Sequence, residues 1–203
     1  MVTSQLHPDP VRVGRAFVSV YALSYAGGAL LFLAPLLVSL ALKVNDLVGI
    51  DRAPRSLALV TGVGSLFAIV SNPFFGRLSD RTTSRLGMRR PWMLVGLAGG
   101  ALGTVTVAVA PNIGVVLVGW VLCQVFLNAL LAAQAAVLPD QVPSSQRGVV
   151  SGVLGVCVPA ASVAGTYLVQ AFDQSQLTMF LAPCVVGAVL VLWFVTTLDD
   201  RRL

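Results

Sequence analysis

The sequence predicts an all-α polytopic membrane protein, in which six transmembrane helices form one domain over residues 1–203. Only 10% of the residues are charged and 57% are hydrophobic, whereas a soluble domain averages about 25% charged residues. Six apolar stretches also reach the roughly 20 residues that a membrane-spanning helix needs. A β-barrel is excluded, because its strands would be about half as long and would alternate polar and apolar residues.

The first apolar stretch follows a polar N-terminal segment and is too long for the apolar part of a signal peptide, so we expect it to persist as a helix. Short polar connections separate the next five stretches, and Pro111 and Asn112 make the third connection very tight. We see no soluble domain or linker between the spans. We place the spans at about 16–42, 56–75, 91–110, 113–138, 149–172 and 177–198.

The basic residues are divided unequally between the two sides of the predicted bundle. With six spans, both termini lie on one side together with the second and fourth connections. The opposite side carries only Lys43, Arg52 and Arg55. Because cytoplasmic loops carry an excess of Lys and Arg, this asymmetry predicts a protein of the inner or plasma membrane with both termini in the cytoplasm. The basic residues on the predicted cytoplasmic side are Arg12, Arg15, Arg77, Arg81, Arg85, Arg89, Arg90, Arg147, Arg201 and Arg202.

The spans lack the side chains that indicate an enzyme or an ion relay. No Asp, Glu, Lys, Arg or His lies in the central part of any span, and ionisable residues there normally mark proton or ion pathways. We find no nucleophile with a base, no phosphate-binding loop and no cluster of metal ligands. The cysteines lie singly in apolar stretches, which indicates packing. We therefore expect neither enzyme activity nor a cofactor, and the excess of arginine needs no nucleic-acid partner.

Neutral polar residues form stripes along four of the spans, which suggests that these four surround a polar cleft. Small and hydroxylated residues also hold helices together, so packing remains an alternative. Two amides on one face of the fourth span favour a cavity more strongly, because they need more partners than a packed interface readily supplies. Our candidates for the substrate cavity are Tyr21, Ser24, Tyr25, Gln124, Asn128, Ser162 and Thr166, and the second span adds a stripe of Thr61, Ser65 and Asn72.

The third span is nearly free of polar residues but carries two interleaved glycine pairs. Gly96 and Gly100 are four residues apart, and so are Gly99 and Gly103. Small residues at this spacing let two membrane helices approach closely. We therefore predict tight packing of the third span against a neighbour.

The connection between the second and third spans, GRLSDRTTSRLGMRRPW, crowds five arginines and an aspartate into 17 residues. Gly76 would allow the second helix to approach a neighbour closely, and Asp80 could accept hydrogen bonds at a helix N-terminus. The arginines could pair with carboxylates or with anionic lipid head groups. Contacts of this kind suit a gate; the alternative is that the arginines only set the topology. The candidate gate residues are Gly76, Asp80, Arg81, Arg85, Gly87, Arg89 and Arg90.

This connection resembles the signature loop between the second and third helices of the major facilitator superfamily. The family pattern is Gly-x-Leu-Ser/Ala-Asp-Arg/Lys, then a glycine and a basic pair, and here it runs from Gly76 to Arg81, then Gly87, then Arg89 and Arg90. The resemblance implies two inverted three-helix repeats, transport by alternating access, and a loop that holds two halves together on the cytoplasmic side. The longer spacing TTSRL and the stretch LPDQVPSSQRG are similar to the glycoside and sucrose cation-symporter branch, although the spans lack that branch's membrane aspartates.

Members of this superfamily normally have twelve spans, and this chain resembles their N-terminal half. The resemblance therefore implies a partner: a second copy in a homodimer, or a separate six-helix half. We expect a secondary transporter of a small neutral polar or sugar-like solute that also contacts membrane lipids. Two alternatives stay open: a non-transporting half or fragment that awaits its partner half, and a membrane scaffold subunit whose arginines bind lipid or protein.

Overall fold

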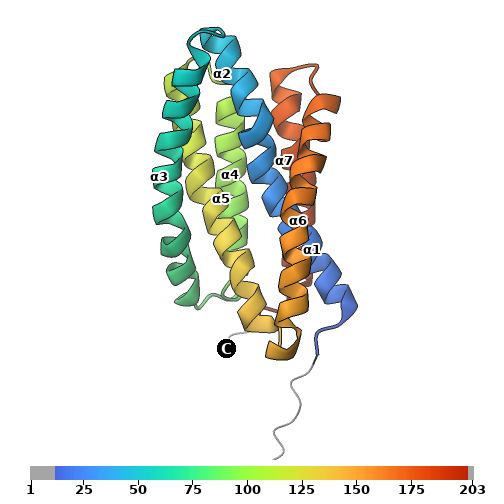
Figure 1. The fold of residues 1–203 in the computed structure, drawn as a ribbon. Helices are drawn as coiled ribbons and strands as arrows, with labels where there is room; N and C mark the ends of the chain where they lie inside the picture. The colour runs from blue at the N-terminus through green and yellow to red at the C-terminus, as the bar shows by residue number, and fades with distance from the viewer. Residues whose placement is uncertain (1–11, 201–203) are drawn as a thin grey trace, which may run out of the picture.

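Six membrane-length helices make up the part of the chain described by the structure, residues 12–200 of a computed structural model. The first runs from Arg15 to Val48 and consists of α1 (Arg15–Ala34), the π-helical turn η1 (Pro35–Ser39) and α2 (Leu40–Val48). The prediction of an all-α bundle with six membrane-length helices is confirmed (Figure 1). The other five are α3 (Ala53–Asp80), α4 (Arg90–Ala108), α5 (Ile113–Gln141), α6 (Ser144–Ala171) and α7 (Gln176–Thr197).

Several helices extend beyond the apolar stretches that predict them. The second span was expected at about 56–75, but α3 continues to Asp80. Polar residues at the end of a long helix remain helical because they lie beyond the hydrocarbon, where water and head groups solvate them. Side-chain caps set two of the starts: Asn112 accepts from the backbone of Val115 at α5, and Ser175 forms a capping box at α7.

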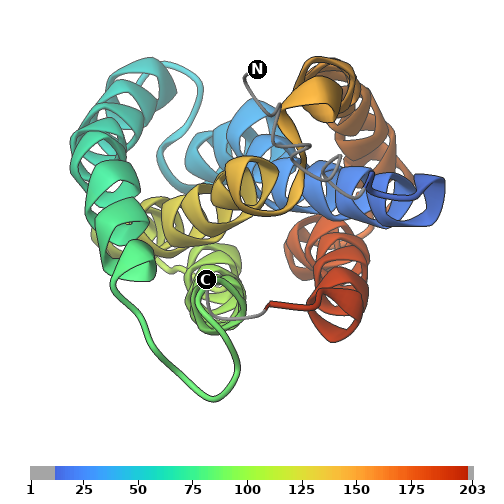
Figure 2. The same ribbon diagram turned by 90° about the horizontal axis from the view of Figure 1, so that it is seen from below.

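The helices are arranged around a central pair, α1 and α5 (Figure 2). α4 and α7 contact each other on one side of this pair; α3 packs on α5, and α6 packs on α1. These contacts are symmetric between the first three spans (α1, α3 and α4) and the last three (α5, α6 and α7). If α1 is exchanged with α5, α3 with α6 and α4 with α7, the same pairs of helices are in contact. Corresponding spans run in opposite directions, because two spans lie between them in the chain. The arrangement is that of two inverted three-helix repeats.

Glycines set the distance between α4 and α5. A Cβ atom added at Gly96 would lie 2.6 Å from the backbone nitrogen of Leu130, and one at Gly103 would lie 2.7 Å from that of Cys123. Added Cβ atoms at Gly99 and Gly100 would collide with Phe126 and Leu127 of α5. The predicted tight packing of the third span is therefore confirmed, with α5 as the neighbour.

One face of the central pair is flanked by α3 and α6 and, within residues 12–200, has no helix across it (Figure 2). In the most apolar 18-residue windows of α3 and α6, only 17% and 22% of the residues are buried, against 44–56% in the other four spans. We call this side of α1, α3, α5 and α6 the open face. Its helices have a surface that the described chain does not cover.

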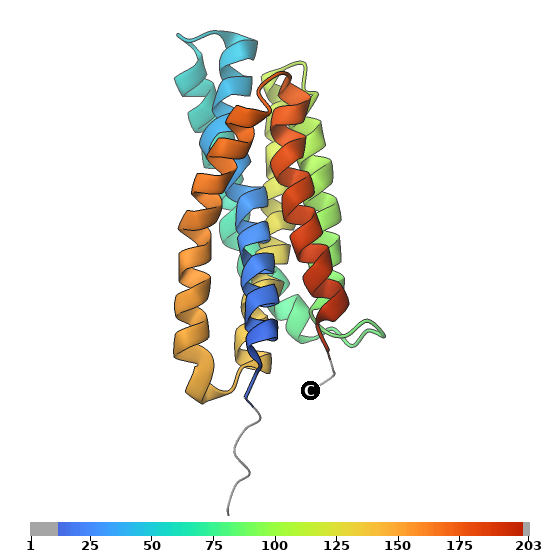
Figure 3. The same ribbon diagram turned by 90° about the vertical axis from the view of Figure 1, so that its right-hand side faces the viewer.

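α1 begins and α7 ends at the same end of the bundle, and the connection between α3 and α4 lies there too (Figure 3). We call this end the arginine-rich end. It carries Arg12, Arg15, Arg77, Arg81, Arg85, Arg89, Arg90 and Arg147.

Candidate functional site

Arg89 lies at the centre of the arginine-rich end, at the start of α4. Its side chain is only 5% exposed, and two carboxylates contact it: Nη1 lies 2.7 Å from Asp80 Oδ1, and Nε lies 2.7 Å from Asp140 Oδ2. Nη1 also donates to Ser79 Oγ at 3.0 Å. Asp80 ends α3 and Asp140 is near the end of α5. A single guanidinium therefore joins three helices.

The charges around Arg89 favour its cationic form. Burial by itself would lower the pKa of Arg89, but the hydrogen bonds and charges of Asp140 and Asp80 outweigh burial and raise it. The planar guanidinium can bind both carboxylates at once through different N–H groups. Removing a carboxylate would leave a buried cation with less compensation. We call Arg89, Asp80 and Asp140 the ion cluster.

A third aspartate, Asp200, lies at the N-terminus of α4. Asp200 Oδ2 accepts from the backbone N–H groups of Arg89 at 2.7 Å and Arg90 at 2.9 Å. Gly87 lies against it with φ 101°, and an added Cβ atom would collide with Asp200. The role of helix N-terminal acceptor, predicted for Asp80, thus belongs to Asp200. Asp80 instead lies beside the Arg89 side chain.

Arg90 strengthens the same connection between α4 and the end of α7. Its guanidinium donates to the carbonyl oxygen of Leu198. Arg90 and Asp200 thus both connect the start of α4 to the residues that follow α7. Neither Asp140 nor Asp200 was singled out from the sequence. The available signal was that both are carboxylates at the predicted ends of spans, on the same side as the arginines.

The other gate candidates lie apart from these contacts. Arg81 and Arg85 are exposed, and within residues 12–200 their side chains make no hydrogen bond or ion pair. The expected close approach at Gly76 is not made, because an added Cβ atom would meet no atom within 4 Å. Gly76 lies on a side of α3 that the described chain leaves uncovered.

Two of the cavity candidates are inside the bundle. Tyr21 and Ser24 are fully buried, and the Tyr21 hydroxyl donates to the carbonyl oxygen of Gln134 at 2.7 Å. Gln134 Nε2 in turn donates to Ser24 O and Ser24 Oγ, both at 2.8 Å. Tyr21 also stacks on Phe194 of α7. These side chains hold α1 against α5 and α7, and neither candidate reaches the open face. Gln134, an amide in an apolar stretch, was not singled out from the sequence.

Gln124 and Asn128 form a polar cluster between α5 and α3. Asn128 Nδ2 donates to the Gln124 carbonyl oxygen at 2.7 Å, and its Oδ1 accepts from Asn72 Nδ2 at 3.4 Å. Gln124 and Asn128 are 3% and 8% exposed, whereas Asn72 is exposed. The structure thus brings the amides of the second and fourth spans together, with Asn72 at the outer edge.

The remaining cavity candidates are at the open face or beside it. Tyr25 borders a hollow of about 220 Å³ between α1, α5 and α6, which Ser151 and Gly155 also line. Ser162 is half-buried further along α6, and Thr166 is exposed. Ser151, Gly155, Ser162 and Thr166 are at helical spacing, which puts all four on one side of α6.

At the opposite end of the bundle, a buried lysine connects three elements. Lys43 is 5% exposed, and its Nζ donates to Ala108 O at 2.9 Å and to Gln176 Oε1 at 2.6 Å. Gln176 Nε2 donates to Asp46 Oδ2 at 2.6 Å. A cation is favourable beside the C-terminal carbonyl groups of α4. In the sequence, Lys43 was only one of the three basic residues on the side opposite the termini; in the structure it joins α2, α4 and α7.

A family model described as Major Facilitator Superfamily matches residues 16–202. The chain belongs to the major facilitator superfamily. It is similar to an uncharacterized symporter of Synechocystis sp., with 43% identity over 54 residues, which are 27% of this chain and 10% of the symporter. It is also similar to a triacylglyceride transporter of Mycolicibacterium hassiacum, with 32% identity over 146 residues, which are 69% of this chain and 26% of that transporter. The chain thus spans about a quarter or less of these curated relatives.

Membership of the superfamily points to transport rather than catalysis, and the bundle is a six-helix half of its fold. In this half, both arginines of the basic pair of the signature loop make contacts within the chain. Arg89 belongs to the ion cluster, and Arg90 contacts the end of α7. Three other arginines of this stretch, Arg77, Arg81 and Arg85, are exposed and have no carboxylate partner within residues 12–200.

Proposed function

We propose that the chain is half of a secondary transporter that moves a small neutral polar or sugar-like solute by alternating access. The observation that carries the proposal is the open face, where the sparsely buried α3 and α6 flank the central pair. Exposed polar groups such as Asn72 and Thr166 on these helices cost free energy in hydrocarbon. A second six-helix unit against this face would remove them from lipid and enclose a polar cleft.

The partner in this proposal is a second copy or a separate six-helix half. A second copy related by a two-fold axis would bury the same face of each chain. The excess of arginine at the end where α1 begins and α7 ends supports an inner-membrane or plasma-membrane orientation with that end in the cytoplasm.

The chemistry of the open face supports a neutral solute. Its polar groups include the hydroxyl groups of Tyr25, Ser151 and Thr166 and the amide of Asn72. Such groups bind hydroxyl-rich solutes through hydrogen bonds, whereas an ionic solute would call for a charged partner. An amphiphilic lipid is a second candidate, favoured by the 32% identity with a triacylglyceride transporter.

Uptake into proteoliposomes tests the proposal directly. The purified chain is reconstituted, its insertion is verified, and a panel of sugars, polyols and triacylglycerides is offered. Ser151→Leu would narrow the hollow beside Tyr25, so we expect it to lower uptake of the transported solute at least about tenfold. Val189→Leu on the outside of α7, where Val189 is 59% exposed, is the matched control and should transport normally.

Absence of uptake by a verified, self-paired preparation would rule out the homodimer as the transporting unit. Activity restored by a co-reconstituted second half would identify the chain as a half that needs a different partner. The variant Asp80→Asn distinguishes these two transporter hypotheses from a membrane scaffold subunit. It removes one of the two carboxylates that contact Arg89. We expect it to reduce transport with folding preserved, whereas a loop that only sets topology would tolerate it.

A further inference from the structure

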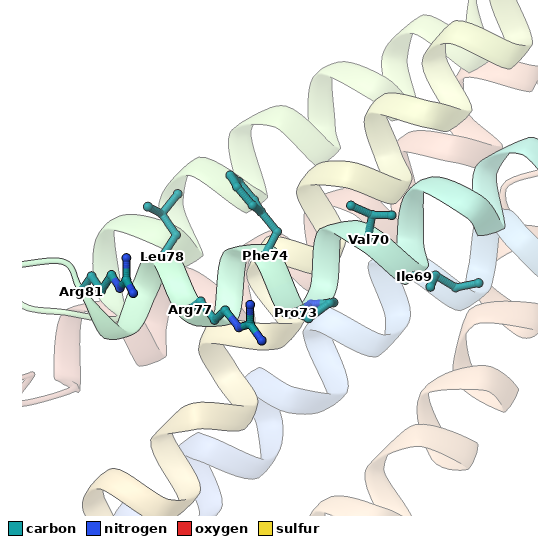
Figure 4. A pocket seen from close by; sticks show the side chains of 7 residues that line it. All are labelled: Ile69, Val70, Pro73, Phe74, Arg77, Leu78 and Arg81. Atoms are coloured by element: carbon teal, nitrogen blue, oxygen red, sulfur yellow. The ribbon is translucent and has the colours of Figure 1, made fainter.

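The outer side of α3 carries an apolar hollow that ends in two arginines (Figure 4). The hollow has a volume of about 600 Å³ and is lined by Ile69, Val70, Pro73, Phe74, Arg77, Leu78 and Arg81. We propose that this hollow binds an anionic phospholipid, with its phosphate at Arg77 and Arg81 and an acyl chain along Val70 and Phe74. The inference concerns a lipid site and does not depend on which solute is transported.

The two arginines are suited to a phosphate group. Both are exposed and, in the part of the chain that the structure describes, have no carboxylate partner, in contrast to the buried Arg89. They are four residues apart in sequence and so lie one helical turn from each other. Guanidinium groups bind phosphate oxygens through paired hydrogen bonds. The net positive charge of this pair favours an anionic lipid over a zwitterionic one, whose ammonium group would be repelled.

The depth of the arginines in the membrane also agrees with a lipid head group. α3 has 28 residues, which corresponds to a length of about 42 Å, whereas the hydrocarbon core is about 30 Å thick. About four residues at each end of a centred helix therefore lie at the level of the head groups. Arg77 and Arg81 occupy that level, and Ile69 lies about 12 Å deeper than Arg77.

The apolar part of the hollow is a surface for an acyl chain. Val70 and Phe74 are 67% and 56% exposed, and Val70, Phe74, Arg77 and Arg81 follow one another at helical spacing on one side of α3. Asn72 is two residues from both Val70 and Phe74, so it points about 200° away around the helix. Because Asn72 contacts α5 at the open face, a second unit seated on that face would leave the hollow accessible to lipid.

Native mass spectrometry of the intact chain, titrated with dioleoyl phosphatidylglycerol or dioleoyl phosphatidylcholine, tests the proposal. We expect tighter binding of one phosphatidylglycerol molecule. Arg77→Gln combined with Arg81→Gln should weaken that binding about 30-fold. The matched control, Arg12→Gln with Arg85→Gln, removes the same charge from the same end of the bundle and should bind phosphatidylglycerol normally.

A second variant distinguishes a defined lipid-binding site from non-specific attraction of the lipid to positive charge. Val70→Trp keeps both arginines and fills the hollow, so we expect it to weaken phosphatidylglycerol binding about tenfold. Equal binding of the two lipids, or equal loss in both double variants, would overturn the proposal. So would an Arg77/Arg81 variant that alters self-association while lipid binding stays unchanged, since a second copy would then occupy the hollow. All of the substituted side chains are exposed, so we expect every variant to fold normally. Size-exclusion profiles verify that each variant is folded.

Discussion

At the arginine-rich end, residues of the same type have different roles. Arg89 is buried between Asp80 and Asp140, whereas Arg85, four positions earlier in the same loop, is exposed. A loop rich in arginine does not reveal from its sequence which guanidinium will be buried. That depends on which carboxylates the ends of α3 and α5 place beside it.

Replacing Arg89 should therefore destabilise the bundle more than replacing any exposed arginine of the loop. Arg89→Gln removes two charge-assisted contacts, and we expect a loss of about 2 kcal/mol in the free energy of unfolding. The value is limited because Asp80 is 59% exposed and water can solvate it again. Unfolding in a mixed-micelle denaturant titration measures the loss. The control Arg85→Gln should leave the midpoint unchanged, and equal midpoints for the two variants would argue against the ion cluster.

Two glycines of the signature loop should respond in opposite ways to alanine. Gly87 has φ 101° and no room beside Asp200, so Gly87→Ala should cost about 2 kcal/mol. Gly76 is helical with open space around it, so Gly76→Ala should be neutral or should stabilise the unpaired unit by up to about 1 kcal/mol. The same denaturant titration compares them. A destabilising Gly76→Ala in the unpaired unit would contradict the structure at this position.

At the scale of the helices, the polar stripes predicted from the sequence differ in how deeply they are buried. The stripe of the first span is largely buried, because α1 lies in the central pair and is covered by α5, α6 and α7. The stripe of α6 stays at the surface, because this helix packs mainly on α1 and has another side free. Helical periodicity placed each stripe on one side of its helix. The number of neighbours then decided whether that side is core or surface.

The contact between α4 and α5 should be the least tolerant of added volume. Gly96→Ala would bring a methyl group against the backbone of α5, and we expect a loss of about 2 kcal/mol. Thermal unfolding in detergent reports the change. Gly62→Ala in α3, where an added Cβ atom meets nothing within 4 Å, is the matched control and should not destabilise. Similar midpoints for both would show that the two helices can move apart freely.

For the whole molecule, the main prediction is how two copies would pair. A two-fold axis through the open face places α3 of one copy beside α6 of the other. Because the two helices run in opposite directions, Asn72 and Gly152 then lie at a similar depth. In a background without Cys123, Cys157 and Cys184, we expect Asn72→Cys with Gly152→Cys to form a covalent dimer under mild oxidation in membranes. The control pairs Asn72→Cys with Val189→Cys on the outside of α7 and should remain monomeric. A monomer in both cases would exclude the homodimer.

The sequence by itself determined the six helices, the distribution of arginine and the glycine contact of the third span. Apolar length, charge and residue size act locally or along one helix, so no knowledge of neighbours is needed. The tertiary structure decided that Arg89 binds Asp80 and Asp140, that Asp200 occupies the start of α4, and that Lys43 is buried. These contacts join segments far apart in the chain. Such pairings depend on how the two three-helix repeats pack, which no local pattern encodes.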